Sequence, residues 1–387
     1  MGVTAYKWRS FMNYSTVYVG MDVHKDSFAV CCYTNEKEKP EYIQTLDAHY
    51  SKVLNYIEAM RFHYGDDAMF ICGYEAGCLG YTLYHQLTNH GVKCIILAPS
   101  TMAKPAGGIK VKTDKKDAAL IARCLAHRDY KPVHIPTAQD EQVKEYIRMR
   151  DDHVSALKKV KQQILSFCLR HDYRFDGSKS KWTQKHLTWL KALDPEGLYK
   201  EILEEYLITY EMLKNKIERI DRRIEELASD RNYEEKVKKL NCFLGIKTYT
   251  ALSLLVETGD FNRFDNARSY SAYLGLVPGE DSSGSRRTGL SITKAGNSHL
   301  RRLLIEATQA YSRGQVGHKS QILKTKQEGN TPTTIAYADK ANERLRRKYY
   351  GMTLRNGKNA NIAKTAVARE LSCFIWGMMT ENYAQLS

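Results

Sequence analysis

The sequence lacks any long apolar run. No stretch approaches the roughly 18 apolar residues that a membrane-spanning helix requires, and residues 1–15 have no apolar core of the kind found in secretion signals. The nine cysteines form no CxxC pair and have no His pair nearby at zinc-binding spacing, which favours buried, reduced thiols. These absences predict a cytoplasmic protein with no membrane partner.

Glycine is missing where one class of enzymes needs it. Actin-like sugar kinases and ATPases begin with a strand that ends in Asp, as this chain does at Asp22, but a glycine-rich hairpin that holds phosphate follows that Asp. Here residues 23–27 read Val-His-Lys-Asp-Ser and contain no glycine. The sequence therefore argues against a kinase or an ATPase.

Positive charge, in contrast, is abundant. The 387 residues include 59 Lys and Arg against 44 Asp and Glu, a net charge of +15, which favours a polyanionic partner such as nucleic acid. Residues 284–302 carry five basic and no acidic residues, and residues 339–369 carry nine basic and two acidic ones. A non-enzymatic protein that binds nucleic acid through such patches is therefore one candidate class.

Residues 16 to about 130 alternate between strand-like and helix-like segments. β-branched and aromatic runs predict strands, and apolar residues at helical spacing predict helices. Three strands followed by helix, strand, helix and strand is the order of a ribonuclease-H-like α/β fold. The expected strands are 17–22, 27–34, 42–46, 69–74 and 92–97, and the expected helices are 52–64 and 81–89.

Four carboxylates are the most informative chemical feature of this region. Asp22 and Glu75 end two apolar strands, where a charge is costly without a partner or a metal ion. Asp114 and Asp117 lie three residues apart in a helical stretch, so they share one helix face. Mg²⁺ prefers oxygen ligands, and two ions roughly 4 Å apart can hold the attacking and leaving oxygens of a phosphodiester. We therefore expect a nuclease-type site with two Mg²⁺ ions, for which Mn²⁺ can substitute.

Other polar residues lie near these acids. Lys112, Lys115 and Lys116 are candidates to hold phosphates at the site, and a solvated helix face is the alternative interpretation. His24 lies two residues after Asp22, and His299 lies in the basic C-terminal stretch. Each histidine is interpreted first as a structural hydrogen-bonding residue.

Long charged helices follow the α/β region. Between residues 199 and 227 the apolar positions recur at alternating steps of 4 and 3, which predicts a coiled-coil seam. This helix can fold back on the helical segment 143–169 through a loop at 177–197, or it can pair two protomers, and both remain open. The seam consists of Tyr199, Leu203, Tyr206, Tyr210, Leu213, Ile217, Ile220, Ile224 and Leu227.

A third region starts near residue 237. Residues 240–251 place a glycine-containing turn between two apolar helices, which is typical of a helix-hairpin-helix element and equally of an ordinary helical corner. Further on, Ser282-Ser283-Gly284 precedes two arginines, and a serine there can attack a phosphodiester while arginines offset the charge. The same short sequence is common in loops. The candidate nucleic-acid contacts of this region are Arg286, Arg287, Lys294, Arg301 and Arg302.

Several short motifs, in combination and in order, point to one family. The N-terminal part contains Val19-Gly20-Met21-Asp22-Val23-His24-Lys25, Tyr74-Glu75-Ala76 and Lys112-Thr113-Asp114-Lys115-Lys116-Asp117-Ala118. The C-terminal part contains Tyr273-Leu274-Gly275-Leu276-Val277-Pro278, Ser283-Gly284, and Ile292-Thr293-Lys294-Ala295-Gly296-Asn297 with Leu300-Arg301-Arg302. On these motifs, from about residue 17 to 380, the chain resembles the DEDD-type transposases of the insertion-sequence family one-ten and its sister group eleven-eleven. That family comprises recombinases guided by a bridge RNA.

The resemblance implies a fold and a set of site residues. It implies a RuvC-like N-terminal domain, a long coiled-coil linker and a mainly helical C-terminal transposase domain. It further implies that Asp22, Glu75, Asp114 and Asp117 bind Mg²⁺ and that a serine joins covalently to DNA. That serine is Ser283 by motif match, and the adjacent Ser282 leaves a second register open. We place the domains at residues 17–138, 139–236 and 237–387, after an N-terminal extension at 1–16.

The reaction implied by the resemblance is excision and insertion of a mobile element. Its partners are element-end DNA, target DNA and a bridge RNA, and we expect the protein to associate with the nucleoid. The family also implies that the serine of one protomer meets the carboxylates of another, which predicts a dimer or a tetramer. The alternative is a metal-and-water endonuclease of the Holliday-junction-resolvase kind, which uses the same acids without a covalent intermediate.

Overall fold

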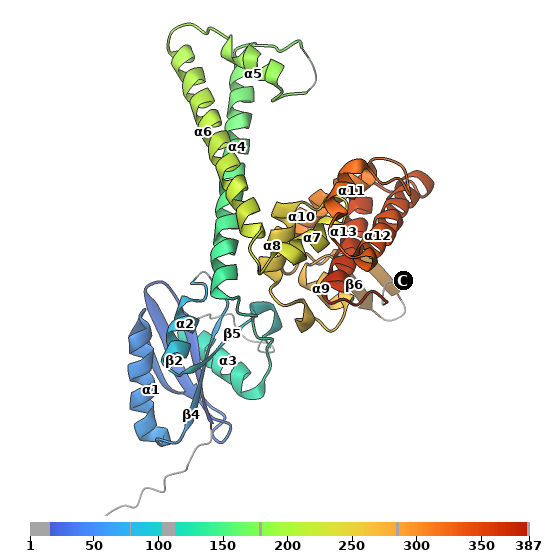
Figure 1. Cartoon of the computed structure of the whole chain (residues 1–387). Helices are drawn as coiled ribbons and strands as arrows, with labels where there is room; N and C mark the ends of the chain where they lie inside the picture. Colours follow the sequence, from blue (N-terminus) through green and yellow to red (C-terminus); the bar gives the residue numbers. More distant parts are fainter. Residues whose placement is uncertain (1–15, 78, 103–112, 178–179, 284–285, 385–387) are drawn as a thin grey trace, which may run out of the picture. The chain divides into compact units, whose positions relative to one another are not determined.

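The computed structural model describes residues 16–77, 79–102, 113–177, 180–283 and 286–384, with the backbone alone for residues 100, 280–283 and 286–289. The chain divides into two compact units, Met1–Ile135 and Pro136–Ser387, called unit 1 and unit 2 below. Unit 1 is a mixed α/β domain and unit 2 is mostly helical (Figure 1). The predicted extension up to residue 15, Lys112 and Gly284 lie outside the described residues.

Unit 1 contains a five-stranded sheet in the order β3-β2-β1-β4-β5. β1 pairs antiparallel with β2 and parallel with β4, and β4 pairs parallel with β5. Each element predicted before residue 98 is confirmed, to within two residues at its ends. The strands are β1 (Thr16–Val23), β2 (Ser27–Tyr33), β3 (Glu41–Asp47), β4 (Met69–Glu75) and β5 (Lys93–Leu97), and the helices are α1 (Tyr50–Tyr64), α2 (Thr82–Asn89), the 3₁₀ turn η1 (Pro99–Thr101) and α3 (Asp114–His127).

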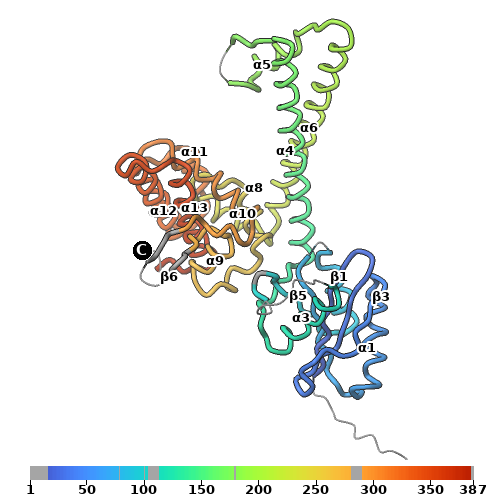
Figure 2. Tube along the Cα trace, turned by 180° about the vertical axis from the view of Figure 1, so that it is seen from behind, coloured from blue at the N-terminus to red at the C-terminus, as the bar shows by residue number. Residues whose placement is uncertain are grey.

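Different helices cover the two faces of this sheet. Val17, Val19 and Met21 of β1 are fully buried in a core shared with α1 and α2. Ala29 and Cys31 of β2 share another core with residues of α3. Because successive side chains of a strand point to opposite faces, the sheet is the middle of three layers. Figures 1 and 2 show α1 and α3 on opposite sides of it.

Unit 2 begins with two long helices, α4 (Ala138–Arg170) and α6 (Leu198–Ala228). Nε of Arg150, in the first half of α4, donates to Oδ1 of Asp221 near the end of α6, at 2.6 Å. Ile164, further along α4, shares a core with Leu203 near the start of α6. The two helices therefore pack antiparallel, and the chain folds back on itself here. Most of the predicted seam is buried, but Tyr199 at its start is 50% exposed.

The predicted loop at 177–197 is wrong in part, because it contains helix α5 (Gln184–Lys191). The Thr183 side chain accepts a hydrogen bond from the backbone N–H of His186 and caps the helix start. Leu190 is fully buried in the core that also contains Phe167 of α4 and Leu203 of α6. Eight residues make about two turns, too few for helical periodicity to stand out from a loop. Tertiary packing stabilises this helix.

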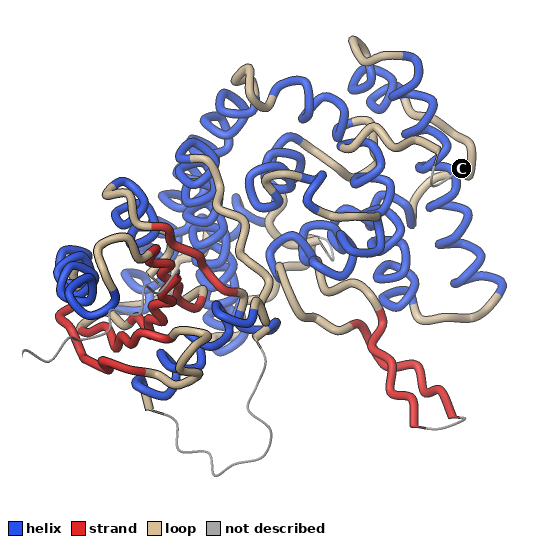
Figure 3. The backbone as a smooth tube through the Cα atoms, turned by 90° about the horizontal axis from the view of Figure 1, so that it is seen from below, coloured by secondary structure: helices blue, strands red, loops and turns tan. Residues whose placement is uncertain are grey.

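The rest of unit 2 surrounds a second, larger core. Leu371, Phe374 and Ile375 of the last helix are at most 1% exposed in it. The strand hairpin of this part, which the sequence did not predict, extends away from the helices (Figure 3). The elements are α7 (Glu234–Asn241), α8 (Thr248–Thr258), η2 (Phe261–Arg263), α9 (Ala267–Tyr273), β6 (Pro278–Ser283), β7 (Arg286–Ile292), α10 (Ser298–Ala307), η3 (Thr308–Ser312), α11 (Gln321–Gln327), α12 (Pro332–Tyr350), the π turn η4 (Gly351–Arg355) and α13 (Ala360–Met379).

The glycine-containing turn between α7 and α8 lies where the sequence predicts it. Gly245 has a φ of +80°, and a Cβ there would lie 2.1 Å from the carbonyl oxygen of Ala307. The backbone N–H of Leu244 donates to Oδ1 of Asn342 at 2.8 Å, so this donor is used inside unit 2. Across the described residues, none of the helices combines the length and apolar character needed to cross a membrane.

Candidate metal centre

The end of β1 and the start of α3 bring carboxylates together. Asp22 ends the buried part of β1, and its side chain is 17% exposed. Asp114 and Asp117 occupy the first turn of α3, where the helix dipole favours negative charge. The Thr113 side chain starts this helix by accepting from the backbone N–H of Lys116. The cap thus determines where α3 begins. The packing of α3 on β1 brings the first turn of the helix close to the end of β1, where Asp22 lies.

Glycine makes this packing possible. A Cβ at Gly20 would lie 2.1 Å from the carbonyl oxygen of Ala118 in α3, and a Cβ at Gly73 would lie 2.8 Å from Leu125. Gly20 and Asp22 share one face of β1 because they are two residues apart. Asp22 therefore lies on the face of the sheet that α3 covers.

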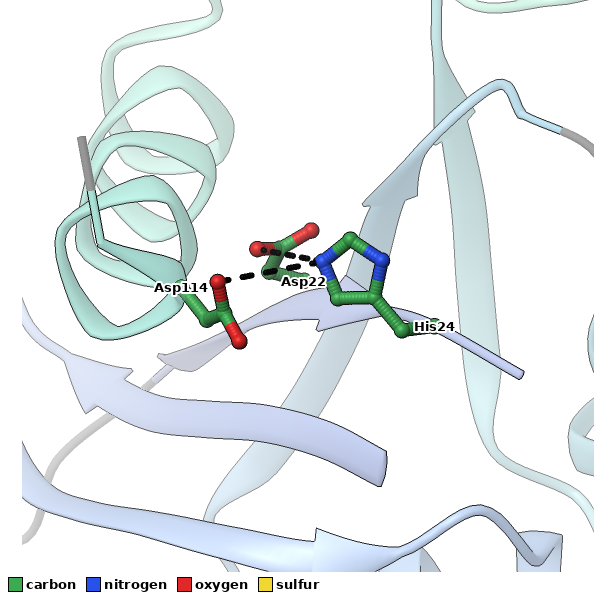
Figure 4. Close-up of side chains that lie close together, drawn as sticks. All are labelled: Asp22, His24 and Asp114. Carbon is green, nitrogen blue, oxygen red and sulfur yellow. Dashed lines mark hydrogen bonds and ion pairs between the residues drawn. The ribbon is translucent and has the colours of Figure 1, made fainter. Parts of the chain in front are cut away.

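Three side chains form the tightest group at this place. One ligand atom from each of Asp22, His24 and Asp114 lies within 4.8 Å of the others, and the residues that the structure describes contain no second group of this kind. Nε2 of His24 lies 3.3 Å from Oδ2 of Asp22 and 3.9 Å from Oδ1 of Asp114. Figure 4 shows the imidazole facing both carboxylates. Two carboxylate oxygens and an imidazole nitrogen are donors that suit a divalent cation.

The other two predicted acids lie around this group. Asp117 lies in the same first turn of α3 as Asp114, and its charge raises the pKa of Asp22. Glu75 ends β4, and because Met21 pairs with Tyr74, Asp22 and Glu75 follow at equivalent positions of neighbouring strands. Glu75 is exposed and lies outside the group of three. A role for all four acids in metal binding stays a prediction.

Sequence reasoning did not include His24 among the ligands. The available signal was its position two residues after Asp22, just beyond the strand. Such spacing is common and does not by itself distinguish a ligand from a solvated turn residue. In the structure, the ring of His24 lies near Asp114 of α3, a contact that its sequence position alone does not indicate.

Electrostatics at Asp22 predicts a measurable effect on stability. Burial raises the pKa of Asp22 above its ordinary value of 3.8, His24 lowers it, and Asp117 and Asp114 raise it further. A carboxyl with a raised folded-state pKa favours the fold below the unfolded pKa, and this contribution is lost as pH rises through the folded pKa. At pH 7 and without divalent ions, ionised Asp22 therefore destabilises unit 1.

We expect Asp22→Asn to raise the free energy of unfolding of the metal-free protein at pH 7 by on the order of 1 kcal/mol. The gain should vanish near pH 3, where Asp22 is protonated in the wild type too. Circular dichroism melts in EDTA measure this, and Asp26→Asn, in an exposed carboxylate of the same turn, is the matched control. A metal-free Asp22→Asn protein that melts below wild type would contradict the prediction.

The candidate serines lie in the hairpin of unit 2. Ser283 is the last residue of β6 and pairs with Arg286 in the ladder, and Ser282 pairs with Arg287. Both serines and both arginines thus belong to one antiparallel hairpin, with Gly284 outside the described residues. The choice between the two serines stays a prediction.

Five of the eight predicted nucleic-acid contacts have side chains that the structure describes, and these five fall into two groups. Lys115, Lys116 and Lys294 are exposed. Arg301 donates through Nη1 to the carbonyl oxygen of Leu274 at 2.9 Å, and Arg302 forms ion pairs with two acids of unit 2. The two arginines therefore already have structural partners within unit 2.

Asp151 of α4 is one partner of Arg302 and gives a second stability prediction. It also accepts hydrogen bonds from Tyr249 Oη, at 2.5 Å, and from Nδ1 of His299, at 3.1 Å. Burial alone raises the pKa of Asp151, but the hydrogen bonds from His299 and Tyr249 and the charge of Arg302 hold it at about 2. A lowered carboxyl pKa stabilises the fold above the unfolded pKa, and this stability is lost as pH falls through the folded pKa.

We expect Asp151→Asn to lower the stability of unit 2 by about 2 kcal/mol at pH 7 and by much less at pH 2. Urea unfolding followed by tryptophan fluorescence suits this test, because Trp182, Trp189 and Trp376 all belong to unit 2. Asp172→Asn, in a largely exposed carboxylate paired with Arg174, should change little at either pH. If the difference in free energy of unfolding between wild type and Asp151→Asn stayed constant with pH, the lowered pKa of Asp151 would be contradicted.

Comparison with known proteins identifies similar sequences over most of the chain. A family model described as a transposase, of the DEDD IS110 type, matches residues 19–171. A model described as transposase IS116/IS110/IS902 family matches residues 237–322. These two matches fall on the α/β region with the first long helix and on the start of the C-terminal region.

Individual relatives extend this similarity along the chain. The transposase for insertion sequence element IS1533 of Leptospira borgpetersenii is 30% identical over 86% of this chain and 95% of its own length. The transposase for insertion sequence element IS1111A of Coxiella burnetii is 26% identical over 83% and 86%, respectively. The pilin gene-inverting protein of Moraxella lacunata is 25% identical over 84% and 92%.

Proposed function

This chain belongs to the IS116/IS110/IS902 family of transposases, and on that premise we propose that it excises and inserts a mobile element through a covalent serine–DNA intermediate, with a bridge RNA as guide. Strand cleavage requires divalent metal ions in this proposal, Mg²⁺ or Mn²⁺. The observation that carries it is the group of donor atoms from Asp22, Asp114 and His24 at the end of β1. A protein that only binds nucleic acid has no need of such a group.

The fold supports an assignment of parts to this function. The strand order β3-β2-β1-β4-β5, with β2 antiparallel and β4 parallel to β1, supports a ribonuclease-H or RuvC-like domain at residues 17–138. The antiparallel pair α4 and α6 supports a coiled-coil linker at 139–236. Residues 237–387 then form the transposase domain that presents the serine.

Each site residue has a defined task in the proposed reaction. Asp22, Glu75, Asp114 and Asp117 would hold the metal ions, and Lys115 and Lys116, next in α3, would orient the DNA phosphates. A bound divalent ion stabilises negative charge on the scissile phosphate. The basic residues nearby make the same site attractive to the DNA backbone.

The serine of the β6–β7 hairpin supplies the nucleophile. Oγ of Ser283 forms a bond to phosphorus as one P–O bond of the DNA strand breaks, and the serine proton ends on the oxygen that leaves. The product is a phosphodiester between enzyme and DNA, which conserves the energy of the broken bond. A free DNA hydroxyl can therefore reverse the step on a new strand without ATP.

The proposed partners follow from this scheme. They are element-end DNA, target DNA and a bridge RNA, and the enzyme acts as a dimer or tetramer in which Ser283 of one protomer serves the acids of another. The net charge of +15 supports polyanionic partners. The similarity to a pilin gene-inverting protein supports DNA strand exchange over plain cleavage.

Subunit mixing tests the shared site. Asp22→Ala and Ser283→Ala proteins should each be inactive on element-end DNA, and together they should recover part of the wild-type activity once subunits have exchanged. Recovery follows because a mixed oligomer contains one site with intact acids and an intact serine. Exchange itself is checked by co-purification of differently tagged subunits. Verified exchange without recovered activity would refute the shared site.

A further inference from the structure

His24 lies next to the proposed metal ligands, although the proposed function assigns the metal ions to four acids alone. Its Nε2 faces Asp22 and Asp114 at 3.3 and 3.9 Å, although these acids come from different elements, β1 and α3. The same nitrogen therefore lies close to carboxylates from two separate elements. The nitrogen lies where a third ligand would complete a set begun by the two carboxylates.

The backbone holds this histidine in place. His24 directly follows the last paired residue of β1, since Val23 pairs with Phe28 in the ladder. Its backbone N–H donates to the carbonyl oxygen of Ser27 at 3.0 Å and closes the tight turn between β1 and β2. The turn therefore fixes the main chain of His24 relative to Asp22 and leaves only its side-chain torsions free.

The chemistry of the donors decides which ion such a set prefers. Mg²⁺ favours oxygen ligands and retains several waters, whereas imidazole nitrogen suits transition metals. We propose that His24 is a direct ligand of the divalent metal ion held by Asp22 and Asp114, and that it makes this site select Mn²⁺ over Mg²⁺. The inference rests on the proposed metal-dependent function and adds a nitrogen ligand to its oxygen donors.

The imidazole of His24 can contact either Asp22 or a bound metal ion. Without a metal ion, its Nε2 contacts Oδ2 of Asp22. With an ion between the carboxylates, the lone pair of neutral Nε2 would bind the ion instead. The side chain is 56% exposed and Asp114 is 61% exposed, so an ion can enter from solvent without opening the core.

Mn²⁺ offers a spectroscopic readout that does not depend on catalysis. Electron spin-echo modulation of bound Mn²⁺ detects ¹⁴N only when a nitrogen is coordinated to, or nearly in contact with, the ion. The full-length wild-type protein with one equivalent of Mn²⁺ should show the ¹⁴N modulation of an imidazole. His24→Ala should lose it, and His90→Ala should keep it, because exposed His90 follows α2 on the opposite face of the sheet.

The affinities of the protein for Mn²⁺ and Mg²⁺ provide a second test of the inference. His24→Ala should weaken Mn²⁺ binding at least about 10-fold, since the loss of even an outer-sphere partner of a metal ligand costs about 10–100-fold. It should change Mg²⁺ binding by less than about 3-fold, because Mg²⁺ replaces one ligand by water readily. Free Mn²⁺ is counted by continuous-wave electron paramagnetic resonance, and Mg²⁺ is measured by competition with Mn²⁺.

Mn²⁺ binding by the Asp22→Asn protein distinguishes a failure of this inference from a failure of the proposed function. If Mn²⁺ binding depends on Asp22 but the wild type gives no ¹⁴N modulation, His24 is not a ligand and the metal site stands. If the modulation persists in His24→Ala, another nitrogen is the ligand and the inference is wrong. If Mn²⁺ binding is unaffected by Asp22→Asn, the proposed metal centre itself fails.

Discussion

Ser283→Ala should abolish the covalent protein–DNA adduct and lower strand exchange by on the order of 10³-fold or more, as expected when a nucleophile is removed. The physical reason is that no other group then forms the bond to phosphorus, although the four proposed metal ligands are unchanged. The assay uses labelled element-end DNA, Mg²⁺ and the RNA that co-purifies with the protein. On a denaturing gel, wild type should give a slow, protease-sensitive band.

Ser282→Ala is the matched control for this experiment. The two serines are adjacent in β6, so both substitutions remove one hydroxyl from the same strand. If Ser282→Ala loses the adduct and Ser283→Ala keeps it, the nucleophile is Ser282. Cleavage without an adduct in the wild-type protein would replace the proposal by a metal-and-water endonuclease, with the hairpin as a DNA-binding loop.

Gly20→Ala should displace α3 and disable the metal centre. The new Cβ would lie 2.1 Å from the carbonyl oxygen of Ala118 and 2.8 Å from Cβ of Ala122. Backbone cannot yield as a flexible side chain does, so the helix must move away from β1. We expect a loss of about 1–3 kcal/mol in stability and, because Asp114 moves with the helix, at least about 100-fold in DNA cleavage.

Gly77→Ala tests whether any added methyl group in this unit has such an effect. A Cβ at Gly77 would meet only the carbonyl oxygen of Glu75, at 3.8 Å, which is an ordinary contact. Its stability should stay within about 0.5 kcal/mol of wild type. Melting temperatures and Mn²⁺ affinities of both variants provide the comparison. A Gly20→Ala protein with wild-type values for both would show that α3 has more freedom than the structure indicates.

The sequence predicted the elements of unit 1 well because their signals are local. Alternating or continuous apolar runs mark β1, β4 and β5, and each of these strands is buried as its pattern requires. Asp22 and Glu75 stood out because a charge ends each of two such runs. Helix α5 was missed because eight residues carry too little periodicity, and its stability comes from distant residues such as Leu203.

The basic residues show that the net charge of a segment is not enough to predict which side chains contact nucleic acid. Arg302 belongs to a stretch with five basic and no acidic residues, which predicted a contact with nucleic acid. In unit 2 its guanidinium meets Asp151, which lies 151 positions earlier in the chain. A net charge within a segment says nothing about partners that folding brings from elsewhere.

By itself the sequence determined the order of strands and helices, the basic character of the chain, and the motifs that place it among transposases. Each of these depends on neighbouring residues or on short spacings that folding does not alter. Only the tertiary structure decided that His24 faces Asp22 and Asp114, and that Gly20 lets α3 lie against β1. The contacts of His24 with Asp114 and of Gly20 with Ala118 join residues that are 90 and 98 positions apart, and only the packing of α3 on the sheet brings them together.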